Sequence, residues 1–124
     1  MVSDGAGVIV CAHGGDPEEG RATLQVAASL AAAYGDTLVL VMGYDPPLIG
    51  GEVGDLRRAA AEVAEGLLAE AVAEVTRLVP GLAVESVLVE DRPTESVLFV
   101  AEQRGARTIV VGHGGEGQIG RAYV

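Results

Sequence analysis

The chain has 124 residues, 49% hydrophobic and 21% charged, with a net charge of −10 at pH 7. This composition is typical of one globular domain and excludes a largely disordered chain. The acidic balance argues against a nucleic-acid partner, because neutralising phosphates needs clustered cations. All 8 basic residues are arginine, which excludes enzymes that need a P-loop lysine or a Schiff-base lysine.

The apolar runs are too short to span a membrane, and Met1–Gly7 has neither the basic start nor the apolar stretch of a signal peptide. We therefore expect a cytoplasmic protein with no membrane partner. The single cysteine, Cys11, excludes a disulfide within the chain. We expect its side chain to be a small core residue, and we predict no metal site.

The first third of the chain predicts a strand, a helix and a second strand. Val8–Ala12 is an apolar run typical of a buried strand, and Thr37–Met42 is another. Between them, Asp16 and Pro17 are typical of a helix start, and Gly35 of a helix end. One face of this helix is expected to be apolar, formed by Leu24, Ala27, Ala28, Ala31 and Tyr34.

The remaining elements alternate in the same way after a proline- and glycine-rich loop at Asp45–Gly54. A long helix is predicted from about Asp55 to Val79, followed by an edge strand at Ala83–Glu90. A third helix is predicted from Pro93 to Arg104, and a fourth strand at Thr108–Val111. The long helix is expected to bury one stripe, formed by Leu56, Ala60, Val63, Leu67, Ala71, Val75 and Leu78.

This order, β-α-β-α-β-α-β, predicts one α/β domain over residues 1–124, with an open parallel sheet and helices on both faces. Ligands of such sheets bind beyond the carboxyl ends of the strands, where the strand order reverses. The fourth strand is nearly all apolar, which suits a covered position better than an exposed edge.

Two strands run into turns that contain histidine and glycine: Ala12-His13-Gly14-Gly15 and Gly112-His113-Gly114-Gly115. Glycines at such a turn let the backbone approach an anion closely. With Val8–Gly14, Arg92-Pro93 and Ile109–Gly112 followed by Gly115, the chain resembles the universal stress protein family. That resemblance covers Val8–Val124 and includes the first half of the family's glycine hallmark, Gly112 and Gly115.

The resemblance implies a doubly wound sheet of the adenine nucleotide alpha hydrolase type, with strand order 3-2-1-4 and a final edge strand missing here. It also implies an adenine nucleotide such as ATP, with Mg as a further candidate, bound between the first and fourth strands. The nucleotide-binding residues expected on this basis are Ala12, His13, Gly14, Met42, Gly43, Val111, Gly112, His113 and Gly115.

Two departures from the family pattern bear on affinity. His13 stands where ATP-binding members carry an aspartate, and the distal Gly-Ser/Thr turn would begin one residue beyond Val124. Losing two hydrogen bonds to charged groups, at about 1.5–3 kcal/mol each, weakens binding at least tenfold. We therefore expect a C-terminally shortened chain that binds nucleotide weakly.

Two functions follow as hypotheses. The first is a stress-response sensor or regulator that binds an adenine nucleotide. The second is a homodimeric interaction protein that binds none, with the apolar fourth strand covered by another chain. No catalytic residues are predicted, because no serine, lysine or carboxylate pair stands in a familiar catalytic pattern; at most, slow ATP hydrolysis is expected.

Overall fold

A computed structural model describes residues 7–14, 17–44 and 53–112. The strands are β1 (Val8–Ala12), β2 (Thr37–Tyr44), β3 (Val84–Glu90) and β4 (Thr108–Val110). The helices are α1 (Pro17–Tyr34), α2 (Val53–Leu78) and α3 (Pro93–Arg104). The expected alternation is therefore present, and every predicted boundary lies within a few residues of the observed one.

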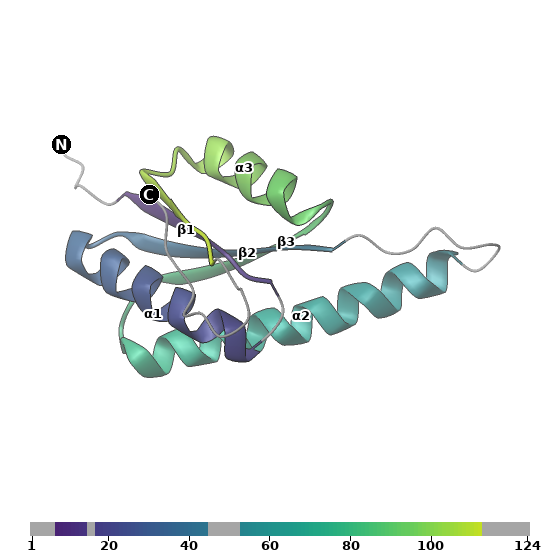
Figure 1. The fold of residues 1–124 in the computed structure, drawn as a ribbon, viewed down its shortest axis with the longest axis horizontal. Coiled ribbons are helices and arrows are strands. Elements are labelled where there is room, and N and C mark those ends of the chain that lie inside the picture. Colours follow the sequence, from purple (N-terminus) through teal and green to yellow (C-terminus); the bar gives the residue numbers. More distant parts are fainter. Residues whose placement is uncertain (1–6, 15–16, 45–52, 113–124) are drawn as a thin grey trace.

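The four strands form one parallel sheet in the order β3-β2-β1-β4, as the family resemblance implied. Helices α1 and α2 cover one face and α3 covers the other (Figure 1). The predicted edge position of β3 is confirmed within this sheet. The expected lack of a further edge strand concerns the chain beyond β4, most of which lies outside the described residues.

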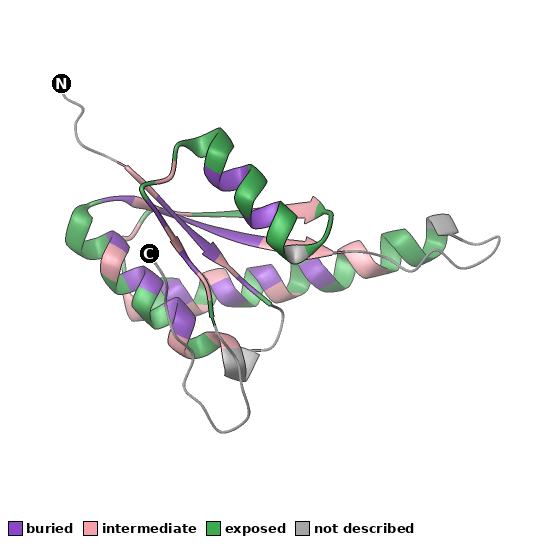
Figure 2. Ribbon diagram, turned by 45° about the horizontal axis from the view of Figure 1, so that its top comes forward, coloured by how far each residue is buried: buried purple, intermediate pink, exposed green. Residues whose placement is uncertain are grey.

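Alternating residues of the central strands supply two separate cores. Ile9, Cys11, Leu38 and Leu40 point toward α1 and α2, whereas Val10, Val39 and Val41 point toward α3; all are fully buried. Figure 2 shows buried residues concentrated in β1 and β2 and along the sheet-facing sides of the helices. The long apolar runs of β1 and β2 are thus explained by burial on both faces.

Glycine residues follow two of the helices at the predicted helix ends. Gly35 and Gly105 follow α1 and α3 with φ of 71° and 60°, and Gly105 donates its N–H to carbonyls of the last turn of α3. Only glycine adopts this left-handed backbone without strain.

Two expected helix faces need correction. The spacing predicts Tyr34 on the buried face of α1, but its side chain is 52% exposed and lies beneath the guanidinium of Arg107. The predicted stripe of α2 is confirmed at Ala71 and Val75, but Val63 is 64% exposed and Leu56 is exposed as well. Ala64 and Leu68 are buried in their place. Alanine appears on every face of α2, so the apolar contrast that would fix the phase of the stripe is weak.

Among the described helices, none combines the length and apolar character that crossing a membrane requires.

Candidate functional site

The carboxyl ends of β1, β2 and β4 form the floor of a pocket with a volume of about 470 Å³. The amino-terminal turns of α1 form one wall and α3 forms the opposite wall. This is the position expected for ligands of an open parallel sheet. Its size falls in the range of small-molecule sites, which is about 300–1,000 Å³.

The strand pairing brings the two glycine turns together. Cys11 of β1 is aligned with Val110 of β4, so that His13 and Gly112 emerge side by side at the same edge. The backbone N–H of His13 still donates to the carbonyl of Val41 in β2, at 2.8 Å. The turn that follows β1 therefore begins between the ends of its two neighbours in the sheet, β2 and β4.

Most of the expected site residues line this pocket. They are Ala12, His13, Gly14, Gly43, Val111 and Gly112. Met42 is different, because its side chain packs into the core beneath α1 and α2, so only its backbone can face the pocket. His113 and Gly115 lie outside the described residues. A nucleotide-binding role for any of these residues remains a prediction.

The two ends of the pocket differ in polarity. Val41, Ile109, Val97 and Leu98 make the side toward α3 mainly apolar, with one hydroxyl, that of Thr94. The side toward α1 carries glycine backbone and two polar side chains, His13 and Thr23. An apolar surface opposite a polar end suits a ligand with a planar apolar part and a polar part.

Gly112 lets β4 approach α1 closely. A Cβ atom at Gly112 would overlap the hydroxyl of Thr23, nearer than real Cβ atoms come to any neighbour. Gly20 has a similar role toward His13, since a Cβ there would lie 3.2 Å from Nδ1 and Cε1 of the imidazole. Close packing of backbone at both places shapes the polar end of the pocket.

His13 Nδ1 and Thr23 Oγ1 are buried polar atoms with no hydrogen-bond partner among the described residues. The His13 and Thr23 side chains are only 6% and 3% exposed. Burial lowers the pKa of His13 below its ordinary value of 6.5, so its imidazole is neutral at pH 7. Buried polar atoms without partners are uncommon, and they are typical of places that a ligand completes.

Cys11 takes no part in this pocket. Its thiol is fully buried in the core under α1 and α2, and burial raises its pKa to about 12. Within residues 7–14, 17–44 and 53–112, no cluster of three or more histidine, cysteine, aspartate or glutamate side chains could hold a metal ion.

Sequence reasoning did not find the pocket residues that belong to helices: Gly20, Thr23, Thr94, Val97 and Leu98. One signal was present. Thr23 is a polar residue beside Leu24 on the buried side of α1, and a polar residue in that position needs a partner.

Comparison with known proteins places this geometry in a family. A model of the universal stress protein family matches residues 6–124. No curated protein sequence is significantly similar to this chain.

Solved structures share the fold. A universal stress protein family member from Burkholderia pseudomallei is 29% identical, with a TM-score of 0.73 over 90% of this chain and 85% of its own. A universal stress protein in complex with cAMP is 20% identical, with a TM-score of 0.72 over 93% of this chain and 82% of its own. The Archaeoglobus fulgidus universal stress protein in complex with dAMP is 18% identical, with a TM-score of 0.68 over 90% and 82% of the two chains.

Proposed function

This chain belongs to the universal stress protein family, and we propose that it binds an adenine nucleotide as a stress-response sensor or regulator. The observation that carries the proposal is the pocket at the carboxyl ends of β1, β2 and β4, with Gly14 and Gly112 at its polar end. Structures of the same fold in complex with cAMP and dAMP support an adenine nucleotide as the ligand class.

The two ends of the pocket fit the two ends of a nucleotide. The apolar surface from Val41, Ile109 and Leu98 suits the adenine ring, and the backbone at Gly43 suits its polar edge. The polar end carries the backbone of Gly14 and Gly112 and the side chains of His13 and Thr23, which can form hydrogen bonds to an anion. We therefore assign the phosphate to the end formed by His13, Thr23 and Gly112.

The proposed role is regulatory rather than catalytic. His13 is the only titratable side chain among the described residues that line the pocket, and no carboxylate lines it. Hydrolysis of a phosphoanhydride depends on groups that position water and neutralise developing charge. Any Mg would therefore enter with the phosphates of the ligand and be held chiefly by them.

Cytoplasmic location, a single domain and a homodimer complete the proposal. Light scattering of the purified protein tests the homodimer directly. A protein that dimerises and binds no nucleotide would instead be an interaction protein, which is the second function considered from the sequence.

The experiment tests for ligand first and for the pocket second. Protein purified without added nucleotide is denatured, and the supernatant is examined for adenine nucleotides by mass spectrometry. Thermal unfolding is then followed with AMP, cAMP and ATP, because a ligand at about one hundred times its Kd adds about 2.7 kcal/mol of stability. No released nucleotide and no stabilisation by any of the three would contradict the proposal.

Two neighbouring residues of α3 provide a matched pair of variants. Leu98 and Phe99 are each 53% exposed, but only Leu98 lines the pocket. We expect Leu98→Asp to weaken nucleotide binding at least about tenfold, through lost apolar contact and repulsion of phosphate. Phe99→Asp, with the same change of charge on the same helix, is expected to leave the Kd unchanged. Equal weakening by both variants would place the ligand elsewhere.

A further inference from the structure

His13 forms part of the wall between two hollows. On one side is the pocket described above. On the other is a smaller hollow of about 180 Å³ between α1 and α2, lined by His13, Arg21, Leu24, Leu67, Glu70, Ala71 and Glu74. Within residues 7–14, 17–44 and 53–112, His13 is therefore the one residue that lines both spaces.

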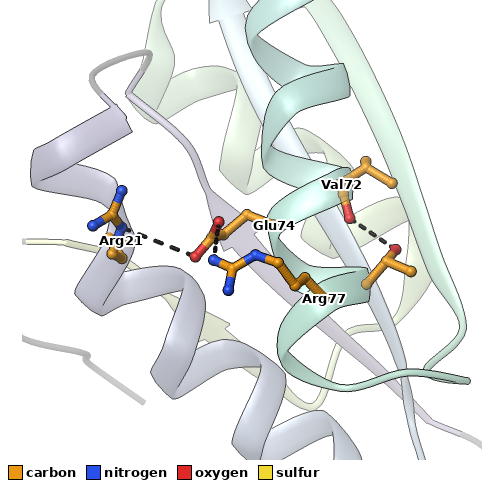
Figure 3. Close-up of polar contacts among 5 residues, drawn as sticks. Arg21, Val72, Glu74 and Arg77 are labelled. Atoms are coloured by element: carbon orange, nitrogen blue, oxygen red, sulfur yellow. Dashed lines mark hydrogen bonds and ion pairs between the residues drawn. The ribbon is translucent and has the colours of Figure 1, made fainter.

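The smaller hollow carries charge. Arg21 faces it from α1, and Glu70 and Glu74 face it from α2. Figure 3 shows Glu74 between two guanidinium groups, with Arg21 Nε at 3.9 Å and Arg77 on its other side. Two carboxylates and one guanidinium thus line the hollow, whereas the described pocket residues of β1, β2, β4 and α3 contribute no charged side chain besides His13 itself.

In the ligand-free protein, burial lowers the pKa of His13 and so favours the neutral imidazole. Nδ1 has no hydrogen-bond partner among the described residues, and it lies against Gly20 at the first turns of α1. An anion at the polar end of the pocket would supply what is missing, namely an acceptor for an imidazolium N–H and a compensating charge. Glu70 and Glu74 of α2 line the hollow on the opposite side of His13.

We propose that His13 takes up a proton from solvent when an anionic nucleotide enters the pocket, so that phosphate binding and imidazole protonation are thermodynamically linked. The inference rests on the proposed function and adds a specificity-determining residue to it. It also assigns a purpose to the histidine that replaces the aspartate expected from the family pattern. A protonated histidine attracts phosphate through a charge-assisted hydrogen bond.

The direction of the pH dependence follows from linkage. A ligand that binds the protonated form more tightly raises the pKa of His13 in the complex above its value in the free protein. Affinity is therefore highest at low pH and falls as the pH rises from the free-state pKa to the bound-state pKa. The limiting slope is about tenfold in Kd per pH unit.

Cyclic AMP and adenosine are the probes. Cyclic AMP is a phosphodiester whose charge stays constant, unlike a phosphomonoester, whose second pKa is about 6. Adenosine has the same base and a similar sugar without the phosphate. We expect cAMP to bind about tenfold or more tightly at about pH 6 than at about pH 8, and adenosine to change less than about twofold.

Calorimetry of the unmodified protein in two buffers of different ionisation enthalpy counts the protons taken up, so this test needs no variant. Uptake of protons with cAMP but not with adenosine is expected. In His13→Asn, which retains a polar side chain, cAMP binding is expected to become weaker at about pH 6 and independent of pH.

The outcomes separate the two proposals. If cAMP binds with the same Kd at both pH values and without proton uptake, the linkage is refuted while nucleotide binding stands. If the pH dependence persists in His13→Asn, a different group is responsible and the assignment is refuted. If neither probe nor any other adenine nucleotide binds, the proposed function itself fails.

Discussion

The contact between Gly112 and Thr23 determines how closely the end of β4 approaches α1. Because a methyl group at position 112 would overlap the Thr23 hydroxyl, we expect Gly112→Ala to destabilise the protein by about 1–3 kcal/mol, the usual cost of overpacking. Urea denaturation measures the change. The φ of Gly112 is not in the left-handed region, so the cost is one of space and not of backbone strain.

Two controls make this steric interpretation specific. Gly14→Ala adds the same methyl group at the matching turn after β1, where nothing lies within 4 Å, and it should change stability little. Thr23→Ala removes the hydroxyl, so Thr23→Ala with Gly112→Ala should recover most of the loss in a double-mutant cycle. Simple additivity of the two single changes would show that Thr23 is not the obstacle.

Among the elements, a buried ion pair joins three segments at the amino ends of the strands, far from the pocket. Asp36, in the turn between α1 and β2, accepts the N–H of Gly7 at 2.8 Å and contacts Arg107 Nε at 2.8 Å. The Asp36 side chain is fully buried, and the guanidinium of Arg107 lies 4.7 Å from the centre of the Tyr34 ring. The contacts of Asp36 thus connect the start of β1 and the α3–β4 turn to the end of α1.

We expect Arg107→Leu to cost about 2–3 kcal/mol, because it leaves the Asp36 carboxylate buried without its cation. The value lies below the full cost for a buried pair, since the Arg107 side chain is 44% exposed. Adding Asp36→Asn should recover part of the loss, as asparagine can still accept the Gly7 N–H. Chemical denaturation of the single and double variants measures both effects.

Arg104→Leu is the matched control for this prediction. Arg104 forms a bidentate pair with Glu85, whose side chain is 50% exposed, and such surface pairs contribute less than about 1 kcal/mol. Equal losses for Arg104→Leu and Arg107→Leu would contradict a special role for the buried carboxylate.

The elements and their order could be predicted from sequence, because long apolar runs, proline starts and glycine ends are local signals. The phase of α2 could not, since alanine on all sides hides which stripe is buried. The spacing of Tyr34 from Ala31 and Ala27 predicts a core position. No local signal shows that Arg107, far along the chain, covers the Tyr34 ring on the outside of the protein.

The half of the pocket formed by the strand ends was predictable from the turns at His13 and Gly112. Thr23 and Leu98 were not, because their place depends on how α1 and α3 pack across the sheet.

At the scale of the whole molecule, the helices on the two faces of the sheet bury different amounts of apolar surface. Among the described residues, the core under α1 and α2 has 12 buried hydrophobic residues and the core under α3 has 6, while Leu98 and Phe99 of α3 are about half exposed. Segments with few buried apolar contacts open at lower free energy than the rest of a domain. We therefore expect the amides of α3 to exchange with solvent deuterium before those of α1 in the ligand-free protein.

Ligand binding should change this order, because α3 forms one wall of the pocket through Thr94, Val97 and Leu98. A nucleotide that bridges this wall and the strand ends stabilises only states in which α3 is docked, so its binding free energy is added to the opening free energy of α3. Hydrogen exchange with mass spectrometry should show cAMP slowing exchange in α3 far more than in the carboxyl half of α2, which supplies none of the described residues that line the pocket. Protection spread evenly over both helices would indicate global stabilisation alone, and protection absent from α3 would remove that helix from the binding site.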